Sequence, residues 1–552
     1  MLQRFAIAFL FAATLFSATL FPTTLVAQAP PEVVAKIVAE GRDNSQVMAH
    51  LDHLTNQIGP RLTGSQRLIL ACEWARDRFK SFGLENARIE QWGEVAVGFD
   101  RGKHTGSATW MGEDGKPVET QLTFGTNAWT VGTNGVKKGA VRSGSGKDAL
   151  EKLPGKVQGS WILVRGGANE ALRKLCEDGG AHGFVLRNRG DLIITSGNMS
   201  TKWEKWGKLP QIQLLPAQWD EIEKRVAAGN EVTLSFDVQN RFKQGPVPLY
   251  NVLAEVKGTK FPDELVIVGG HIDSWDGATG TTDNGTGVAT TLEAARLVAK
   301  SGMKPLRTIR FMLWSGEEQG LLGSREYIKR HPEELPKVSA VLVHDGGTNY
   351  VSGIYGLEEM MPIFEKVFAP VVDLDKDLPF QVRKVKSLPG FIGSDQDSYV
   401  AKGVPGFFWD QKGRANYTHT HHTQHDTFDA AIPEYQSHTS MVVAIGALGI
   451  ANWPTLLPRP QKSTSQPNPA ANRRRLGVDL DAEGMRIVGF AEESRAKTAG
   501  FQVGDRILEV DGSKIASTDD LAAALNSGGN DKKIKVERAG KTLVIEVAFP
   551  AR

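Results

Sequence analysis

Carboxylate and imidazole side chains occur in short polar segments that directly follow apolar runs of the chain. The candidates are His271, Asp273 and Asp283 after ELVIVGG, Glu317 and Glu318 after FMLWSG, Asp345 after AVLVH, and His419, His421, His422, His425 and Asp426 in the segment HTHHTQHDT. Short apolar runs of this kind are typical of buried strands, and functional groups in open α/β sheets gather at the carboxyl ends of the strands. We therefore expect these side chains to meet at one edge of a sheet.

Taken singly, each of these residues has an ordinary structural explanation. A histidine at a strand end is usually a core or surface residue, a Glu-Glu pair commonly begins a helix, and an aspartate in a Gly-rich loop commonly forms a turn. Taken together, nitrogen and oxygen donors of this kind suit a divalent ion, zinc first and manganese or cobalt next. Crowded carboxylates also need cations, because their repulsion would otherwise protonate some of them. Two ions ~3.5–4 Å apart and bridged by one carboxylate meet that need.

Five sequence segments make the chain recognisable. They are IGPRLTGS (58–65), GGHIDSWDGATGTTDNGTGVA (269–289), WSGEEQGLLGS (314–324), VHDG (343–346) and HHTQHDT (421–427). Together they resemble the M28 family of co-catalytic zinc peptidases, which includes aminopeptidases and, nearest in layout, the carboxypeptidase Q subfamily. The resemblance covers about 31–105 and 245–455 and implies two zinc ions per chain.

The resemblance also implies a role for each matching residue. The implied metal ligands are His271, Asp283, Glu318, Asp345 and His422, with Asp283 bridging the two ions, His271 and Asp345 on one ion, and Glu318 and His422 on the other. Asp273 matches the carboxylate that orients His271. Glu317 matches the general base, and a carboxylate beside a metal-activated water is suited to that role. The family further implies a cis peptide bond between Asp283 and Asn284. Gln396 departs from the family, since histidine is usual at its position.

The pattern of apolar runs predicts an α/β fold with a mostly parallel sheet covered by helices on both faces. Helices are expected over 66–82, 285–300 and 319–330, between the strand-like runs. The predicted organisation is a signal peptide (1–27), a first part of the peptidase domain (28–110), an insert (111–245), the metal core of the peptidase domain (246–455), a linker (456–472) and a β-rich C-terminal domain (473–552).

The two accessory regions resemble known modules. GKVQGSWILVRGG (155–167) and KLCEDGGAHGFVLRN (174–188) resemble a protease-associated (PA) domain, which would either restrict access to the cleft or act as a passive insert. AGFQVGDRILEVDG (499–512) resembles a PDZ domain, with the carboxylate-binding loop at 476–478. A PDZ domain captures a C-terminal peptide tail as an added strand, although a folded appendage without a ligand is an equal alternative.

Bulk composition excludes several classes of protein. A net charge of +2 with 23% charged residues gives no reason to expect a nucleic-acid or membrane-surface partner. Two cysteines, Cys72 and Cys176, exclude a thiolate metal cage, and we expect two buried thiols rather than a disulfide. The apolar run after Arg4 and the small residues at Ala27 and Ala29 indicate a signal peptide and export to the periplasm or the medium. Oligomerisation remains open.

The function expected from these residues is metal-assisted hydrolysis of a terminal peptide bond, with a peptide as substrate. A carboxypeptidase or dipeptidase needs a cation for the substrate α-carboxylate, whereas an aminopeptidase needs an acid for the α-ammonium. Arg414 and Lys412 are candidate cations, and carboxypeptidase Q-like polarity is placed first, with an aminopeptidase as the alternative. Two further alternatives are a non-catalytic peptide-binding module that uses the PDZ domain and a mononuclear cyclotransferase. Metal content and catalysis would separate them.

Overall fold

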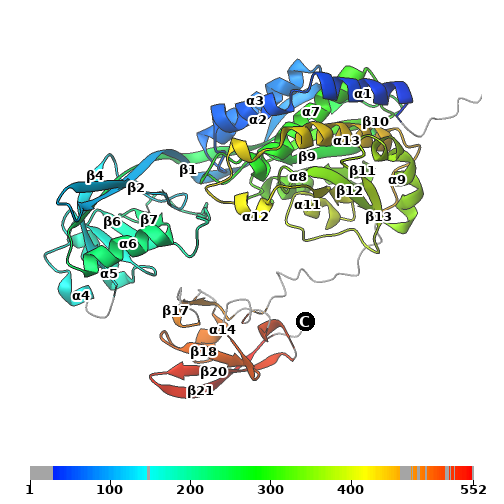
Figure 1. Ribbon diagram of the computed structural model, residues 1–552. Coiled ribbons are helices and arrows are strands. Elements are labelled where there is room, and N and C mark those ends of the chain that lie inside the picture. Colours follow the sequence, from blue (N-terminus) through cyan, green and yellow to red (C-terminus); the bar gives the residue numbers. More distant parts are fainter. Residues whose placement is uncertain are drawn as a thin grey trace, which may run out of the picture.

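The computed structural model describes residues 29–145, 149–204, 206–459, 474, 476–480, 485–490, 494–515, 521, 524–527 and 529–549. The expected signal peptide and most of the expected linker lie outside these residues. Figure 1 shows an α/β unit, a smaller inserted unit joined to it by two long strands, and a β-rich C-terminal unit. Among the described residues, no helix combines the length and apolar character needed to cross a membrane.

The α/β unit is built on the half of a large sheet in which the order is β14-β11-β9-β10-β8, with β1 beyond β8. These strands are β1 (Glu85–Met111), β8 (Val232–Val256), β9 (Phe261–His271), β10 (Arg307–Trp314), β11 (Val338–Val343) and β14 (Gly406–Phe408). The strands β14, β11, β9 and β10 are parallel, whereas β8 and β1 pair antiparallel. The expected α/β fold with a mostly parallel sheet is confirmed, with antiparallel strands at one side.

Helices cover both faces of this sheet because its strands alternate apolar side chains between the two faces. The helices are α1 (Pro31–Asp43), α2 (Val47–Asp52), α3 (Gln66–Ser81), α7 (Thr286–Ser301), α8 (Leu322–Arg330), α9 (Met361–Val367), α10 (Ala369–Val372), α11 (Gln396–Val400), α12 (Tyr417–Thr420) and α13 (Pro433–Ala451). Val266 and Val268 of β9 pack in one core with residues of α1, α3, α7 and α13. Leu265 and Ile267 face the other side and pack in a second core with residues of α8 and α11.

A small three-stranded sheet, β13-β12-β15, extends the α/β unit beside α9 and α13. It consists of β12 (Tyr350–Gly356), β13 (Gln381–Lys384) and β15 (Asp410–Lys412). Short helical turns η1 (His53–Ile58), η2 (Thr281–Gly285), η3 (Leu335–Lys337), η4 (Glu358–Met360) and η5 (Phe428–Ala430) complete the unit. Of these, η2 matters most for function, because it carries Asp283 directly before α7.

The inserted unit continues the same large sheet through β4-β5-β6-β7-β3. Its elements are β2 (Pro117–Gln121), β3 (Phe124–Gly125), β4 (Lys137–Ser143), α4 (Ala149–Lys152), β5 (Trp161–Val164), α5 (Glu170–Asp178), β6 (Gly183–Arg187), β7 (Gln211–Leu214) and α6 (Pro216–Ala227). Trp161 and Trp219 are fully buried and lie in one core of this unit. The identification of the unit as a PA domain stays a prediction.

Strands β1 and β8 join the two units as one antiparallel ladder, in which Glu85 pairs with Glu255 and Trp110 with Val232. The expected boundary at 110/111 falls at the end of β1, and the boundary at 245/246 falls inside β8. Both cysteines are buried and free, as expected, with Cys72 on α3 and Cys176 on α5.

The C-terminal unit has its own small apolar core, which includes Leu476, Ile487 and Val536. Its described elements are β16 (Val478–Leu480), β17 (Ile487–Phe490), α14 (Arg495–Thr498), β18 (Arg506–Val510), β19 (Ser513–Lys514), β20 (Asp531–Arg538) and β21 (Lys541–Ala548). Gly477, in the expected carboxylate-binding loop, has φ 71°, a left-handed conformation that favours glycine.

Candidate metal centre

The candidate residues lie at the carboxyl ends of neighbouring parallel strands. In the ladder, Trp314 of β10 pairs with His271 of β9, and Val343 of β11 pairs with Gly269. This register places Glu317, Glu318 and Asp345 beside His271 as soon as their strands end. Gly316 allows the turn after β10, because its φ is 73° and the Trp92 ring lies 2.8 Å from where a Cβ would stand.

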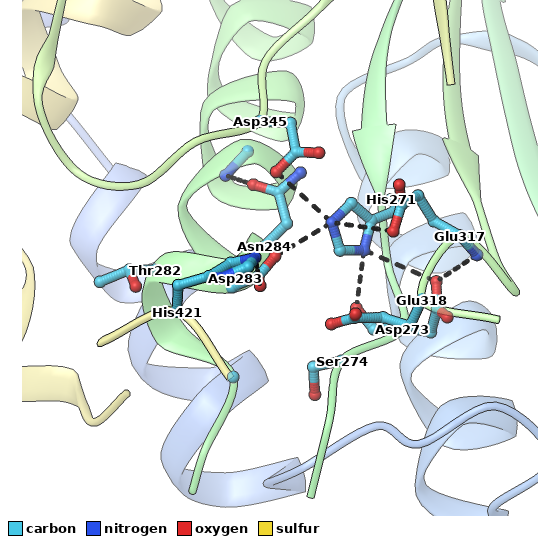
Figure 2. A network of polar contacts seen from close by, with 12 residues as sticks. His271, Asp273, Ser274, Thr282, Asp283, Asn284, Glu317, Glu318, Asp345 and His421 are labelled. Carbon is cyan, nitrogen blue, oxygen red and sulfur yellow. Dashed lines mark hydrogen bonds and ion pairs between the residues drawn. The ribbon is translucent and has the colours of Figure 1, made fainter. Parts of the chain in front are cut away.

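Asp283 lies between the two histidines that were expected to bind different ions. Its Oδ1 lies 3.3 Å from Nε2 of His271, and its Oδ2 lies 3.2 Å from Nε2 of His422. The same His271 nitrogen is 3.5 Å from Oδ1 of Asp345, and the same His422 nitrogen is 3.0 Å from Oε2 of Glu318. Figure 2 shows Asp283, Asp345 and Glu317 directed toward the His271 ring. The sequence-predicted set therefore converges, with Asp283 in the bridging position.

The peptide bond between Asp283 and Asn284 is cis, as expected. The Asn284 side chain donates a hydrogen bond to the His344 carbonyl at 2.9 Å and accepts one from the Gly287 amide at 3.0 Å. These bonds tie the η2 segment to the end of β11 and to the first turn of α7. The backbone that carries Asp283 is thereby fixed from both sides.

Burial and mutual contact shift the pKa values of these groups strongly. Burial opposes the charged form of His271, but the carboxylates of Asp345 and Glu317 outweigh it and hold its pKa well above the ordinary value. Burial lowers the pKa of His422, but the contacts with Asp283 and Glu318 outweigh this effect and raise the pKa to about 10. Burial alone would raise the pKa of Asp283, yet the close approach of the His271 and His422 rings brings it below its ordinary value.

The two adjacent glutamates are shifted in the opposite direction. Burial and the negative charge of Asp283 raise the pKa of Glu318 to about 7. Burial likewise raises the pKa of Glu317 well above its ordinary value, and the charges of Asp345 and Glu318 add to this effect, while His271 opposes it. Crowding of these buried carboxylates therefore disfavours their charged forms. A divalent cation would stabilise all of these carboxylates in their charged form.

The donor atoms fit a metal ion well. Within the described part of the chain, Oδ2 of Asp283 is buried and accepts no hydrogen bond, although His422 Nε2 is near. Two groups of three donors each have ligand atoms within 4.8 Å of one another, namely His271 with Asp283 and Asp345, and Asp283 with His421 and His422. Both groups share Asp283, and all their donors are nitrogen or oxygen, as zinc accepts.

Comparison with known proteins identifies the fold. The profile of peptidase family M28 matches residues 251–445, a segment that contains every residue of this cluster. The α/β unit is a peptidase family M28 domain. A PDZ domain profile matches residues 486–538 of the C-terminal unit.

Similar proteins agree with this identification. Carboxypeptidase Q of Mus musculus is 25% identical over 448 residues, which cover 78% of this chain and 90% of the relative. An aminopeptidase of Pseudomonas aeruginosa is 42% identical over 200 residues, which cover 35% of this chain and 36% of the relative. The crystal structure of a peptidase M28 precursor from Shewanella amazonensis has a TM-score of 0.55 at 26% identity and covers 78% of this chain and 99% of that chain. The protein is therefore an enzyme of the metallopeptidase class, a hydrolase.

Asp273 contacts His271 differently from the expected carboxylate–imidazole pair. The Nδ1 atom of His271 lies 3.0 Å from the backbone carbonyl of Asp273 and 3.6 Å from its carboxylate. The carboxylate instead accepts hydrogen bonds from the Thr63 hydroxyl at 2.7 Å and from the Glu317 amide at 3.3 Å. Asp273 therefore fixes the His271 ring mainly through its main chain and fixes Glu317 through its side chain.

Two residues without an assigned sequence role position the Asp283 loop of the M28 domain. The Asp426 carboxylate accepts hydrogen bonds from the amides of Thr282 at 2.5 Å and Asp283 at 3.3 Å. Arg61 is fully buried and donates to the carbonyls of Ile272, Gly59, Thr279 and Gly280 at 2.7–3.1 Å. Arg61 belongs to the IGPRLTGS segment (58–65), so the presence of this motif could have indicated that Arg61 supports the site.

Asp395 is a third residue of the site whose role the sequence did not indicate. It is fully buried in the segment that includes Gln396, and among the described residues neither of its carboxylate oxygens has a hydrogen-bond partner. Burial raises its pKa to about 7, and its charge acts on Glu317. The charge of Asp395 thus disfavours the ionised form of the Glu317 carboxyl.

A cleft of 1120 Å³ extends from the metal centre along α8 and α11. Glu317, Tyr417 and His421 line its inner end, and Phe391, Arg325 and Lys402 line its outer part. His419 and His425 stack on each other, with ring centroids 4.2 Å apart, and do not line this cleft. Of the three histidines left outside the predicted ligand set, the structure places His421 at the centre.

Proposed function

We propose that this chain is an exported exopeptidase that uses two zinc ions and resembles carboxypeptidase Q in activity. The observation that carries the proposal is the convergence of His271, Asp283, Glu318, Asp345 and His422, with Glu317 beside them and facing the cleft. His271 and Asp345 would hold one ion, Glu318 and His422 the other, and Asp283 both. Zinc held there would supply a Lewis acid that polarises the scissile carbonyl and lowers the pKa of a coordinated water to ~7.

Glu317 would perform the proton transfer. It lines the cleft, lies 4.0 Å from His271 Nε2, and is anchored through its amide by Asp273. Its carboxylate would accept the proton of the attacking water and then donate it to the leaving amine nitrogen, so that it returns to its starting state. Burial suits this role, because it brings the pKa of Glu317 closer to that of the groups with which it exchanges the proton.

The charges along the cleft support a substrate with a free α-carboxylate. Arg325 and Lys402 line the outer cleft, and within the described chain neither side chain has a hydrogen-bond or ion-pair partner. The acidic neighbours there are already engaged, since Glu326 pairs with Lys329 at 3.0 Å and Asp397 accepts from the Gly393 amide at 2.7 Å. Two free cations would attract a carboxylate that extends from the leaving side of the scissile bond.

The cations first considered from the sequence fit this role less well. Arg414 pairs with Glu434 at 2.6 Å, and neither Arg414 nor Lys412 lines the cleft. Phe391 is 59% exposed and lines the cleft on the opposite loop, where it would contact an apolar terminal side chain. Carboxypeptidase or dipeptidase polarity is therefore placed before aminopeptidase polarity.

Digestion of a small peptide library with zinc-loaded protein tests the function. We expect mass spectra to show loss of C-terminal residues, and we expect a chelator to abolish the reaction and added zinc to restore it. Shortening from the N-terminus would favour the aminopeptidase alternative that the Pseudomonas relative's name suggests. Hydrolysis that a chelator leaves unchanged would contradict the metal mechanism. A zinc content of one ion per chain would favour a mononuclear enzyme.

Charge reversal at the cleft tests the polarity. In R325E and K402E we expect KM for a free-acid peptide to rise ~10-fold or more per residue, since a charge-assisted hydrogen bond contributes ~1.5–3 kcal/mol. The same peptide with a C-terminal amide is the matched control, and its KM should change little. Equal effects on both substrates would show that the two cations do not bind the carboxylate.

The expected signal peptide supports export as part of the proposal, to the periplasm or the medium. The PDZ domain would hold a C-terminal tail of a substrate or partner as a strand added beside β16, which follows Gly477. Nucleic acid and, after signal cleavage, membrane are not proposed as partners.

A further inference from the structure

A loop of the inserted unit contacts the histidine-rich loop of the M28 domain at the metal centre. The Thr195 amide donates a hydrogen bond to the His422 carbonyl at 2.9 Å. The Ile193 amide donates to Oε1 of Gln424 at 2.8 Å, and Nε2 of Gln424 donates to the Asp191 carbonyl at 2.8 Å. We call residues 191–195 the docking segment.

The contact falls on a backbone that needs external support. His422 has φ 60°, in the left-handed region that residues other than glycine seldom adopt. Such a conformation is strained and persists where the surrounding structure determines it. The Thr195 amide binds the carbonyl of His422 directly and so helps to hold this residue in that conformation.

Thr195 also contacts the other ligand-bearing loop of the M28 domain. Its side chain is 5% exposed, and its Oγ1 would lie 1.8 Å from a Cβ at position 277. Gly277 belongs to the segment that leads from His271 to Asp283. The docking segment therefore lies between the loop that carries Asp283 and the loop that carries His422.

Gln424 provides the matching contact from the M28 side. The oxygen of its carboxamide accepts one hydrogen bond from the main chain of the docking segment, and the nitrogen donates another to it. This pair of bonds resembles the pairing of two residues in neighbouring strands. One residue, Thr423, separates it from His422, whose ring lies close to Glu318 and Asp283. A shift of the docking segment would therefore move His422, the proposed metal ligand, through the short stretch of chain that joins it to Gln424.

We propose that the docking segment and Gln424 position His422 for metal binding, so that the inserted unit completes one of the two ion sites. The inference rests on the proposed function, because it requires that His422 binds an ion. It assigns the inserted unit a part in metal affinity in addition to any part in covering the cleft. Among the described residues, no hydrogen bond or ion pair joins His271 or Asp345 to the docking segment, so we expect the other ion site to depend on it less.

Zinc titration of metal-free full-length protein, followed by calorimetry, tests the proposal. The variants are Q424A and Q424M, of which the second keeps the side-chain volume without the hydrogen bonds. We expect wild type to bind two ions, and both variants to bind one ion as wild type does and the other ~10–100-fold more weakly, the usual effect of removing a group that supports a ligand. S196A is the matched control, because its hydroxyl bonds Asn127 within the inserted unit.

The outcomes separate the inference from the function on which it rests. Wild-type affinities at both sites in Q424A and Q424M would overturn the inference and leave the proposed function intact. Equal weakening of both sites would also overturn it, since it would indicate a general loss of structure. A wild-type protein that binds no zinc would contradict the proposed function itself.

Discussion

Replacement of Glu317 by glutamine lowers kcat by ~10²–10⁴-fold, the usual contribution of a general acid–base group, while the protein keeps its zinc. The reason is geometric. Glu317 lies at the inner end of the cleft, and its carboxylate is 4.0 Å from Nε2 of His271. It is therefore the carboxylate of the cluster least suited to be a metal ligand. Glutamine keeps its size but cannot accept a proton.

Steady-state kinetics and metal analysis on the same preparation check this result. E326Q is the matched control, because Glu326 lies on α8, lines the same cleft and pairs with Lys329. It should retain kcat within a few-fold of wild type. If E317Q were as active as wild type, or if it lost zinc, Glu317 would not be the proton carrier.

Replacement of Asp283 by alanine should have the largest effect of all, because in the proposed centre this one side chain would hold both ions. Its two oxygens face His271 and His422 separately, so its loss would remove a ligand from each proposed site. We expect activity at background and no tight zinc binding. In wild type, zinc at a thousand times its Kd should stabilise the fold by ~4 kcal/mol, and the variant should lack this gain.

Thermal unfolding with and without added zinc measures that difference. D373A is a suitable control, since Asp373 is exposed and lies between β12 and β13, outside the segments that carry the cluster. Zinc should raise Tm of wild type and D373A but leave Tm of D283A unchanged. A normal zinc-dependent rise in D283A would show that the bridging role is wrong.

The convergence of these residues was predictable because they follow strand-like apolar runs and belong to specific motifs. In a parallel sheet, neighbouring strands end at the same edge, so residues that follow these strands lie close together. His271 at the end of β9 is paired with Trp314 at the end of β10. Choosing His422 over the nearby histidines depended on the family motif, and the contact with Glu318 at 3.0 Å agrees with that choice.

Other features depend on contacts between distant segments, which the spacing of residues does not encode. The sequence could not indicate that the Asp273 carboxylate bonds Thr63 and Glu317, because these residues meet only after α3 and β10 have packed on the sheet. The docking of Thr195 on His422 joins residues more than two hundred positions apart. The continuity of β1 and β8 was hidden because Gly and Pro interrupt their apolar pattern.

The antiparallel ladder of β1 and β8 makes the two larger units mechanically inseparable. The chain enters the insert along β1 and returns along β8, and these two strands pair with each other from Glu85–Glu255 to Trp110–Val232. Twisting of one strand is therefore transmitted to the other. Register shifts at several points along the ladder give it bends without breaking it. A chimaera that exchanges the insert between relatives must therefore carry both strands of this ladder, because junctions at 110/111 and 245/246 would pair residues 97–110 of one protein with residues 232–244 of the other.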